Sequence, residues 1–406
     1  MSVAPEFQVN LTEFSENKVK SRVSEKNSVR YQVLNYDLCC DNDTNLGLYR
    51  SVVIEPETKK ILSYGPPKSV TLDFFKEVHP NIKGDRYQIN ETIEGTMVNL
   101  FYDDRVNSWE ISTKGAISGE YWFYRTVYDA CGNMVTSSEE KQLTFRTMFL
   151  HSLGYSEGSE LNDVELFKEL PKDHIYSFVM QHPENHIVMQ IEFAKLYLVS
   201  VFFKKDSDVL QWVPLNAVQN WSSLSSLAHP IHFPHELKGD EKAYDVLEGY
   251  VQNPYDFRMG VMIADVETGM RTSIINPEYE RLKEIRGNNP NLQYHYYSLE
   301  HADKKNEFLK HFPRYKKKFG AFQRQTADFI RGIHDAYVMY HVQKRGKEVR
   351  IPKYIFNHVY KLHYDVYLPS LQRGERVIVT KNVVADYFNN MQPKEKLYYV
   401  NMTEVA

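Results

Sequence analysis

The sequence predicts an α+β protein in which antiparallel sheets precede a helical C-terminal domain. Short segments with alternating, β-branched or aromatic residues, separated by turn residues, dominate the chain up to about residue 287. Apolar residues then recur at helical spacing from residue 303 to residue 392. Aromatic residues make up 14% of the 406 residues, which favours sheet-rich packing. Contents of 42% hydrophobic and 25% charged residues are typical of globular chains and exclude wholesale disorder and fibrous architectures.

The N-terminal segment is expected to form a partly ordered arm. Residues 1–45 are polar and mixed, and they end in a run of turn-forming residues, Asp41-Asn42-Asp43-Thr44-Asn45. A core domain over residues 46–290 is expected to follow.

Three strand pairs are predicted within this core. Residues 88–102 alternate in part between polar and apolar side chains, and together with residues 109–112 they predict a hairpin around Asp103-Asp104-Arg105. Residues 186–191 and 196–203 predict a second pair, and residues 259–264 and 271–275 predict a third around Thr268-Gly269. A helix over residues 143–150 interrupts the sheets.

A helix is predicted to begin at Asn276 and to end near Gly287. Asn276 suits the N-cap, Pro277 suits the first helical position, and Gly287 suits the end. The domain boundary is therefore placed near residue 290. Residues 291–406 form the predicted helical domain, with apolar stripes that include Phe322, Phe329, Ile330, Ile333 and Tyr337.

Charge, hydropathy and cysteine content limit the classes of protein and the cellular compartments that fit this sequence. The formal net charge of -4 excludes a wholly basic nucleic-acid coat. No stretch reaches the ~18 apolar residues that a membrane span needs, and no apolar leader segment is seen, so no membrane partner is expected. Cys39, Cys40 and Cys131 are too few for a disulfide framework. We therefore expect an intracellular protein of the cytoplasm or nucleus.

The C-terminal domain contains a basic segment. Residues 301–353 hold 14 Lys or Arg against 5 Asp or Glu. Tyr315, Phe319 and Phe322 interleave with cationic side chains, a mixture that can contact RNA phosphates and stack on bases; the cations are Arg314, Lys316, Lys317, Lys318 and Arg324. The same residues also fit a solvated helix face beside a core stripe, and both interpretations stay open.

Five short segments follow one another along residues 91–279. They are Glu91-Thr92-Ile93-Glu94-Gly95-Thr96, Ser112-Thr113-Lys114-Gly115, residues 177–188, Glu248-Gly249-Tyr250-Val251, and residues 272–279. In this order they resemble motifs I, Ia, III, IV and V of the covalent nucleotidyltransferases, most closely those of phage- and virus-type ATP-dependent RNA ligases. The resemblance implies a nucleotidyltransferase (ATP-grasp-like) core over residues 46–290.

The resemblance also implies a chemistry. In that family a lysine attacks the α-phosphate of ATP or GTP and forms a covalent lysyl-nucleotide, with metal ions neutralising the phosphates. Here the lysine position is Thr92, and the acidic position of motif III is Val179. The two basic positions of motif V are Ser273 and Ile275. The residues expected to carry the chemistry are therefore missing, whereas several turn-forming and glycine positions remain.

Two functions follow from the resemblance as expectations. The first is a catalytically degenerate ligase-like protein that binds RNA or is a structural component of an assembly, such as the particle of a large DNA virus. The second is an active ligase or capping-type enzyme in which Lys114 or Lys83 replaces the lost lysine. If a nucleotide pocket remains, the resemblance implies ATP and Mg²⁺ as ligands. Glu94, Gly95, Lys114 and Glu248 would then contact the nucleotide, and Glu248 would contact the metal.

Overall fold

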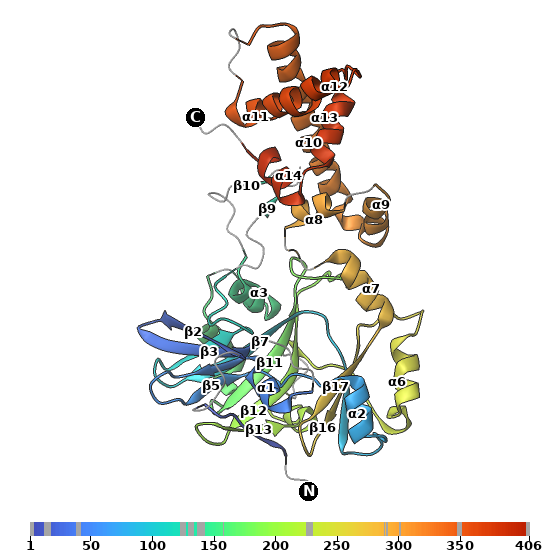
Figure 1. Ribbon diagram of the computed structural model, residues 1–406. Coiled ribbons are helices and arrows are strands. Elements are labelled where there is room, and N and C mark those ends of the chain that lie inside the picture. Colours follow the sequence, from blue (N-terminus) through green and yellow to red (C-terminus); the bar gives the residue numbers. More distant parts are fainter. Residues whose placement is uncertain are drawn as a thin grey trace. The chain divides into compact units, whose positions relative to one another are not determined.

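The computed structural model describes residues 4–402, except for 12–17, 38–41, 122–126, 129–133, 136–142, 157, 225–229, 288, 290, 300–301 and 347–350. The chain divides into two compact units (Figure 1). The sheet unit comprises residues 1–122 and 143–284, and the helical unit comprises residues 123–142 and 285–406. The three cysteines lie outside the described residues. Within the described ranges, no helix is both long and apolar enough to cross a membrane.

The large sheet forms the centre of the sheet unit. Its strands lie in the order β1-β13-β12-β11-β7-β8, with β14 parallel to β12. Their bounds are β1 (Glu6–Gln8), β13 (Val209–Val213), β12 (Lys195–Lys204), β11 (His174–Gln181), β7 (Thr96–Asp103), β8 (Ser108–Ser112) and β14 (Ile231–His232). Side chains such as Leu100, Phe178 and Leu198 pack with those of helices on one face. These helices are α3 (Phe145–Ser152), α4 (Glu165–Glu169) and α5 (Leu215–Val218), with the turn η2 (Leu161–Asp163) between α3 and α4.

The N-terminal segment forms a sheet, so the expected arm over residues 1–45 is wrong for its described residues. The strands β2 (Val19–Lys26), β3 (Val29–Tyr36), β4 (Val52–Ile54) and β5 (Ile61–Tyr64) pair in that order. Asn27 and Ser28 both have positive φ, as a two-residue hairpin turn requires. Val33 and Tyr64 lie in one buried cluster with Phe202 of the large sheet. Two short helices, α1 (Thr44–Gly47) and η1 (Leu48–Arg50), precede β4.

A small sheet completes the unit. Its order is β15 (Glu236–Leu237), β6 (Tyr87–Glu91), β16 (Gly260–Asp265) and β17 (Arg271–Ile275). Ile89, Val261 and Ile263 are fully buried with Phe75 and Leu247, which belong to α2 (Leu72–Val78) and α6 (Tyr244–Val251) (Figure 1). The turn η3 (Gly239–Glu241) precedes α6, and α7 (Pro277–Arg286) follows β17. The α+β class and the hairpins β7–β8 and β16–β17 are confirmed. The predicted first arm of the β7–β8 hairpin, residues 88–102, is wrong in its N-terminal part, because it is divided between β6 and β7 in different sheets.

The predicted pairing of residues 186–191 with 196–203 is wrong. Strand β12 pairs with β11 instead, and residues 186–194 are not a strand. The cause is a contact with a residue distant in the chain, because backbone N–H groups of Ile187, Val188 and Met189 donate to the buried carboxylate of Glu94. The helix predicted from Asn276 is confirmed, since the Asn276 side-chain oxygen accepts a hydrogen bond from the Glu278 N–H at 2.9 Å.

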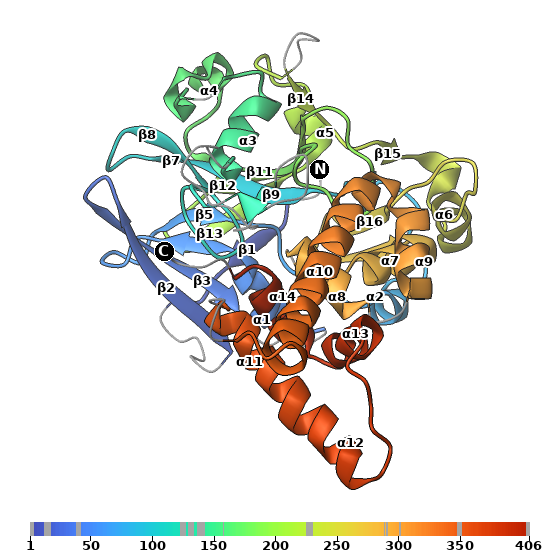
Figure 2. The ribbon, with the colours of Figure 1, turned by 90° about the horizontal axis from the view of Figure 1, so that it is seen from above.

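The helical unit is built around α10 (Lys316–Tyr337). Its helices are α8 (Leu292–Ser298), α9 (Ala302–His311), α11 (Lys353–Lys361), α12 (Leu368–Gln372), α13 (Lys381–Asn389) and α14 (Pro393–Val400). A turn, η4 (Pro313–Tyr315), precedes α10, and the π-helical segments η5 (Val338–Val342) and η6 (Leu362–Tyr367) extend α10 and α11. As a result α11, η6 and α12 form one continuous helical segment (Figure 2). The short strands β9 (Val127–Tyr128) and β10 (Met134–Val135) pair with each other.

We predict that Asp265 stabilises the β16–β17 hairpin through its charge. Its fully buried carboxylate accepts hydrogen bonds from Arg86 (3.0 and 2.9 Å), Thr268 and the Glu267 N–H. Burial raises the pKa of Asp265, but these hydrogen bonds outweigh burial and hold it below 3.8. Asp265→Asn should cost about 2 kcal/mol of unfolding free energy at pH 7, measured by urea denaturation. Because the folded pKa is lowered, this contribution is present above about pH 4 and is lost as the pH falls through the folded pKa.

The matched control is Glu267→Gln. Glu267 pairs with the same Arg86 at 3.0 Å, but its side chain is 48% exposed. The control should therefore cost less than about 1 kcal/mol. Equal losses in the two variants, or a loss that does not shrink in acid, would contradict the role assigned to Asp265.

Candidate functional site

The segment that resembles motif I lies where the chain leaves β6 of the small sheet and enters β7 of the large sheet. The Thr92 N–H donates to the carbonyl of Gly260 at 2.8 Å, which fixes Thr92 beside the start of β16. The hydroxyl oxygen of Thr92 is buried and has no hydrogen-bond partner among the described residues. Thr92 lines a cavity that we call the Thr92 pocket.

The Thr92 pocket contains one predicted ligand-binding residue, Glu94, and several charged residues that were not predicted as ligands. Arg258 and Lys195 both line it, together with Glu91 and Glu192. The Arg258 guanidinium lies 3.6 Å from the Glu91 carboxylate and 4.1 Å from the ring centre of Tyr250. Burial raises the pKa of Glu91, and Arg258 partly offsets this. Lys195 is exposed at the first position of β12, and its only sequence signal is a cation flanking an apolar strand.

Glu94 has a structural role at this crossing. It is 4% exposed, and its two carboxylate oxygens accept the N–H groups of Ile187, Val188 and Met189 at 2.7–3.1 Å. Tyr279 lies beside it, and burial together with the Glu94 charge raises the pKa of that tyrosine. Glu94 thus lines the Thr92 pocket, as predicted for a site residue, but its carboxylate is used by three backbone donors.

Gly95 is required by close packing. A Cβ atom at this position would lie 2.4 Å from the carbonyl oxygen of Met180 and 2.7 Å from a methyl group of Val179. Both neighbours belong to β11, so the position that resembles motif III lies directly against the glycine of motif I. The structure thus brings these two segments together.

Glu248 and Gly249 lie elsewhere. They belong to the helix α6, and the Glu248 carboxylate pairs with Lys76 of α2 at 2.9 Å. Glu248 does not line the Thr92 pocket. The expectation that it contacts nucleotide or metal at the motif I site is therefore not supported by its position, and the described residues contain no group of three His, Cys, Asp or Glu that could hold a metal ion.

The two candidate replacement lysines are exposed. Lys83 lies in the turn before β6, and the Lys114 ammonium lies 4.5 Å from the ring centre of Tyr36. Neither lines the Thr92 pocket. Ser273 and Ile275, at the motif V positions, lie on β17 opposite Met262 and Gly260 and bring no charge there.

Some residues of the basic segment lie in the core of the helical unit and others lie on its surface. Phe319 and Phe322 are 3% and 0% exposed and pack against Tyr296, so the expected base stacking by these two rings is wrong. Tyr315 is half-buried and stacks on Phe308. Arg314 and Lys318 are half-buried, whereas Lys316, Lys317 and Arg324 are exposed. No ion-pair partner is found for these three exposed cations in the described part of the chain.

No family model matches the sequence. One relative is described as an immediate-early protein ICP-46 homolog of Invertebrate iridescent virus 3, with 24% identity over 320 residues. The match covers 76% of this chain and 62% of that protein, so the chain spans less than two thirds of its relative. A viral relative therefore exists, as the resemblance to viral ligase-like proteins led us to expect.

Solved structures to which the chain is similar include ATP-dependent ligases. An archaeal ATP-dependent RNA ligase is 14% identical, with a TM-score of 0.41 and coverage of 73% of this chain and 67% of that one. A Naegleria gruberi RNA ligase with ATP and Mn is 9% identical, with a TM-score of 0.36 and coverage of 55% and 57%.

We predict that the two glycines of the Glu-Gly pairs respond in opposite ways to alanine. Gly95→Ala should cost about 1–3 kcal/mol, because β11 leaves no space for a Cβ atom. Gly249→Ala should stabilise by about 0.5–1 kcal/mol, because a Cβ at Gly249 meets no atom within 4 Å and the residue lies inside a helix. Urea denaturation of both variants gives the comparison. A neutral Gly95→Ala would refute the packing account.

Proposed function

We propose that this chain is a ligase-like protein that does not form a covalent lysyl-nucleotide and that binds RNA through its helical unit. The observation that carries the first part is the environment of Thr92. Its hydroxyl is buried beside Gly260 and has no hydrogen-bond partner among the described residues, so no base is in place to remove its proton. An alcohol without such a base is a poor nucleophile at neutral pH.

The residues present do not fit the metal that the ligase resemblance implies. Glu248 is the expected ligand, and it is engaged by Lys76 on the surface of α2 and α6. Ser273 and Ile275 bring no cation to the place where the family holds phosphate. We therefore derive no catalytic step through a metal ion or through ATP at the Thr92 pocket.

One observation favours the alternative, an active ligase or capping-type enzyme with a relocated nucleophile. Lys195 lines the same pocket as Thr92, which neither Lys114 nor Lys83 does. A lysine nucleophile must lose its proton, and burial or a neighbouring cation is the usual means of lowering its pKa. The Lys195 side chain is exposed rather than buried.

We predict no covalent nucleotide on the wild-type chain. The purified protein is incubated with α-labelled ATP, and separately with GTP, in the presence of Mg²⁺ or Mn²⁺, and is then run on a denaturing gel. No labelled band should appear while an active ligase labels alongside. A band that is lost in Lys195→Met and kept in Lys83→Met and Lys114→Met would establish the alternative.

RNA binding is proposed from the charge of the helical unit. Lys316, Lys317 and Arg324 are exposed in the N-terminal half of α10. Arg324 follows the two adjacent lysines by seven and eight residues, about two helical turns, so the three side chains lie close to one face of the helix. Lys304 and Lys310 of α9 add two exposed cations. Surface cations that lack a carboxylate partner are free to neutralise phosphates. The same surface would serve the structural alternative if its partner is an acidic protein of a viral particle.

We predict that a triple variant, Lys316→Gln, Lys317→Gln and Arg324→Gln, weakens binding to single-stranded RNA about tenfold or more at moderate salt. The slope of log affinity against log salt should fall by about 2, because each lost phosphate contact contributes about 0.7. Fluorescence anisotropy with a labelled oligonucleotide measures both quantities.

The control makes the same charge change elsewhere in the helical unit. Lys361, Arg376 and Lys381 are also exposed. Changing these three to Gln should leave the affinity within about twofold of wild type if the α10 cations form the RNA-binding face. Equal losses in both variants would mean that only net charge matters. Wild-type affinity that does not depend on salt would reject RNA as the partner.

A further inference from the structure

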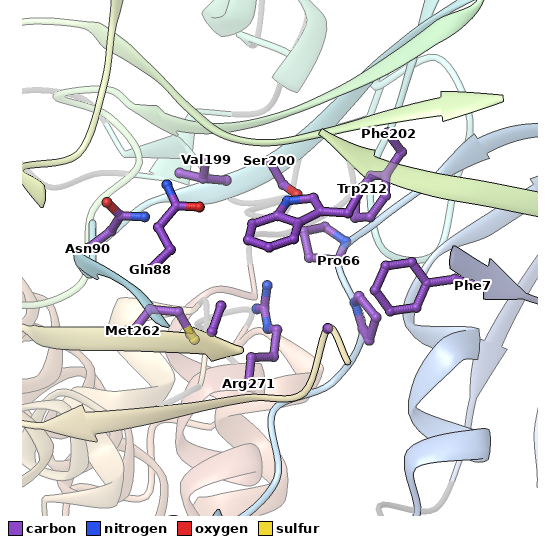
Figure 3. A pocket seen from close by; sticks show the side chains of 13 residues that line it. Phe7, Pro66, Gln88, Asn90, Val199, Ser200, Phe202, Trp212, Met262 and Arg271 are labelled. Carbon is purple, nitrogen blue, oxygen red and sulfur yellow. The ribbon is translucent and has the colours of Figure 1, made fainter. Parts of the chain in front are cut away.

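A second cavity in the sheet unit, which we call the inter-sheet slot, contains an arginine without an acidic partner. The slot lies between β12–β13 of the large sheet and β6, β16 and β17 of the small sheet, and is a cavity of about 50 Å³ that is partly open to solvent (Figure 3). Arg271 is the first residue of β17, and its guanidinium points toward the indole of Trp212 (Figure 3). Phe7 and Met262 supply further apolar lining.

A second arginine, Arg50, does not line the slot, but its charge acts on Arg271. The Gly65 N–H donates to the Ser51 carbonyl and the Val70 N–H donates to the Arg271 carbonyl, so residues 65–70 join the segments that hold the two arginines. Among the described residues, no carboxylate lies within 4.0 Å of either guanidinium. The hydrogen bond found for the Arg271 side chain is a long one, 3.4 Å from Nε to the Ser69 hydroxyl. Burial and, secondly, the Arg50 charge lower the pKa of Arg271 to about 9.

Such an arrangement is unfavourable unless an anion offsets it. A partly desolvated guanidinium that lacks a carboxylate destabilises the folded chain. Buried charges in proteins are normally paired. Departures from this rule concentrate at functional sites.

Two neutral side chains in or beside the slot also have buried polar atoms that a bound molecule could satisfy. Gln88 lines the slot and is 7% exposed, and its buried amide oxygen has no hydrogen-bond partner among the described residues. The hydroxyl of Tyr64 is likewise buried without a partner, and its ring packs edge-on against Phe202 of the slot. Buried polar groups without partners each cost free energy, and a bound molecule can satisfy them.

We propose that the inter-sheet slot binds a small phosphate-bearing molecule, with the phosphate held by Arg271 and an apolar or aromatic part lying against Trp212 and Phe7. Phosphate suits this site because a guanidinium can donate two parallel hydrogen bonds to phosphate oxygens. Gln88 then donates to or accepts from the remainder of the ligand.

This site differs from the positions that carry phosphate contacts in the family. Those positions are Thr92, Ser273 and Ile275 here, and none of them bears a charge. Arg271 precedes Ser273 by two residues on β17, on the same face of the strand. The cationic centre therefore lies at the opposite end of the small sheet's inner face from Thr92. It is also independent of the RNA-binding face proposed on α10.

The test compares stability and binding in one set of variants. Melting temperature is measured with inorganic phosphate, phenyl phosphate and phenol as probes, on wild type, Arg271→Met, Arg271→Lys and the exposed control Arg22→Met. In wild type both phosphates should raise the melting temperature, phenyl phosphate more than inorganic phosphate, and phenol should have no effect. Arg271→Met should remove the response, Arg271→Lys should keep part of it, and Arg22→Met should keep all of it.

The ligand-free proteins give the second readout. Because Arg271→Met removes an uncompensated charge at nearly constant volume, its melting temperature without ligand should equal or exceed that of wild type. A lower value would show that Arg271 is already paired within the protein and would overturn the proposal. So would the absence of any response to both phosphates, or responses that are equal in Arg271→Met and wild type. A response to inorganic phosphate but not to phenyl phosphate would support the anion site and reject the aromatic part of the proposed ligand.

Discussion

The sheet unit depends on one crossing, in which the chain passes from the small sheet to the large sheet at residues 92–95. The Glu94 carboxylate holds three backbone N–H groups of residues 187–189 in place of a strand partner. Gly95 allows the chain to touch β11 at a distance that no side chain permits. Replacing either residue would disturb the start of β7 where it meets β11 and residues 187–189. This constraint explains why a Glu-Gly pair that resembles a catalytic motif persists although the neighbouring nucleophile position is Thr92. The packing of the chain at this crossing is sufficient to explain why Glu94 and Gly95 are present.

The sequence was informative where local chemistry decides the structure. The cap at Asn276, the turn at Thr268-Gly269 and the helical stripe of Phe322, Phe329 and Ile333 depend on neighbours close in the chain, and all three are confirmed. The N-terminal hairpin could have been found from the alternation of residues 29–36 and the Asn27-Ser28 turn. Glu248-Gly249 was misleading because a four-residue pattern does not specify conformation. Tyr244, Leu247 and Val251 recur at helical spacing and were the better signal.

Other features could not be predicted from the sequence. Residues 186–191 are apolar enough for a strand, but a carboxylate more than 90 residues away binds their backbone donors. The meeting of Trp212 with Gln88 joins residues from different sheets that are more than 100 residues apart in the chain. Phe319 and Phe322 looked like stacking residues because they alternate with cations. Only the packing of α8 and α9 on α10 reveals that these rings form the core.

The distribution of charge separates this chain from an active ligase. The positions where a ligase would place cations are neutral, while exposed cations gather on α10 and a partnerless arginine, Arg271, lines the inter-sheet slot. A chain that had only lost function would gain stability by replacing Arg271, since an unpaired charge there opposes folding. We infer that the sheet unit holds any ligand without a covalent bond. Mass spectrometry of one sample incubated with ATP and Mn²⁺, recorded under native and then under denaturing conditions, distinguishes covalent from noncovalent binding. An unmodified chain is expected in the denaturing spectrum, whatever the native spectrum contains. An adenylyl adduct that survives denaturation would contradict this inference.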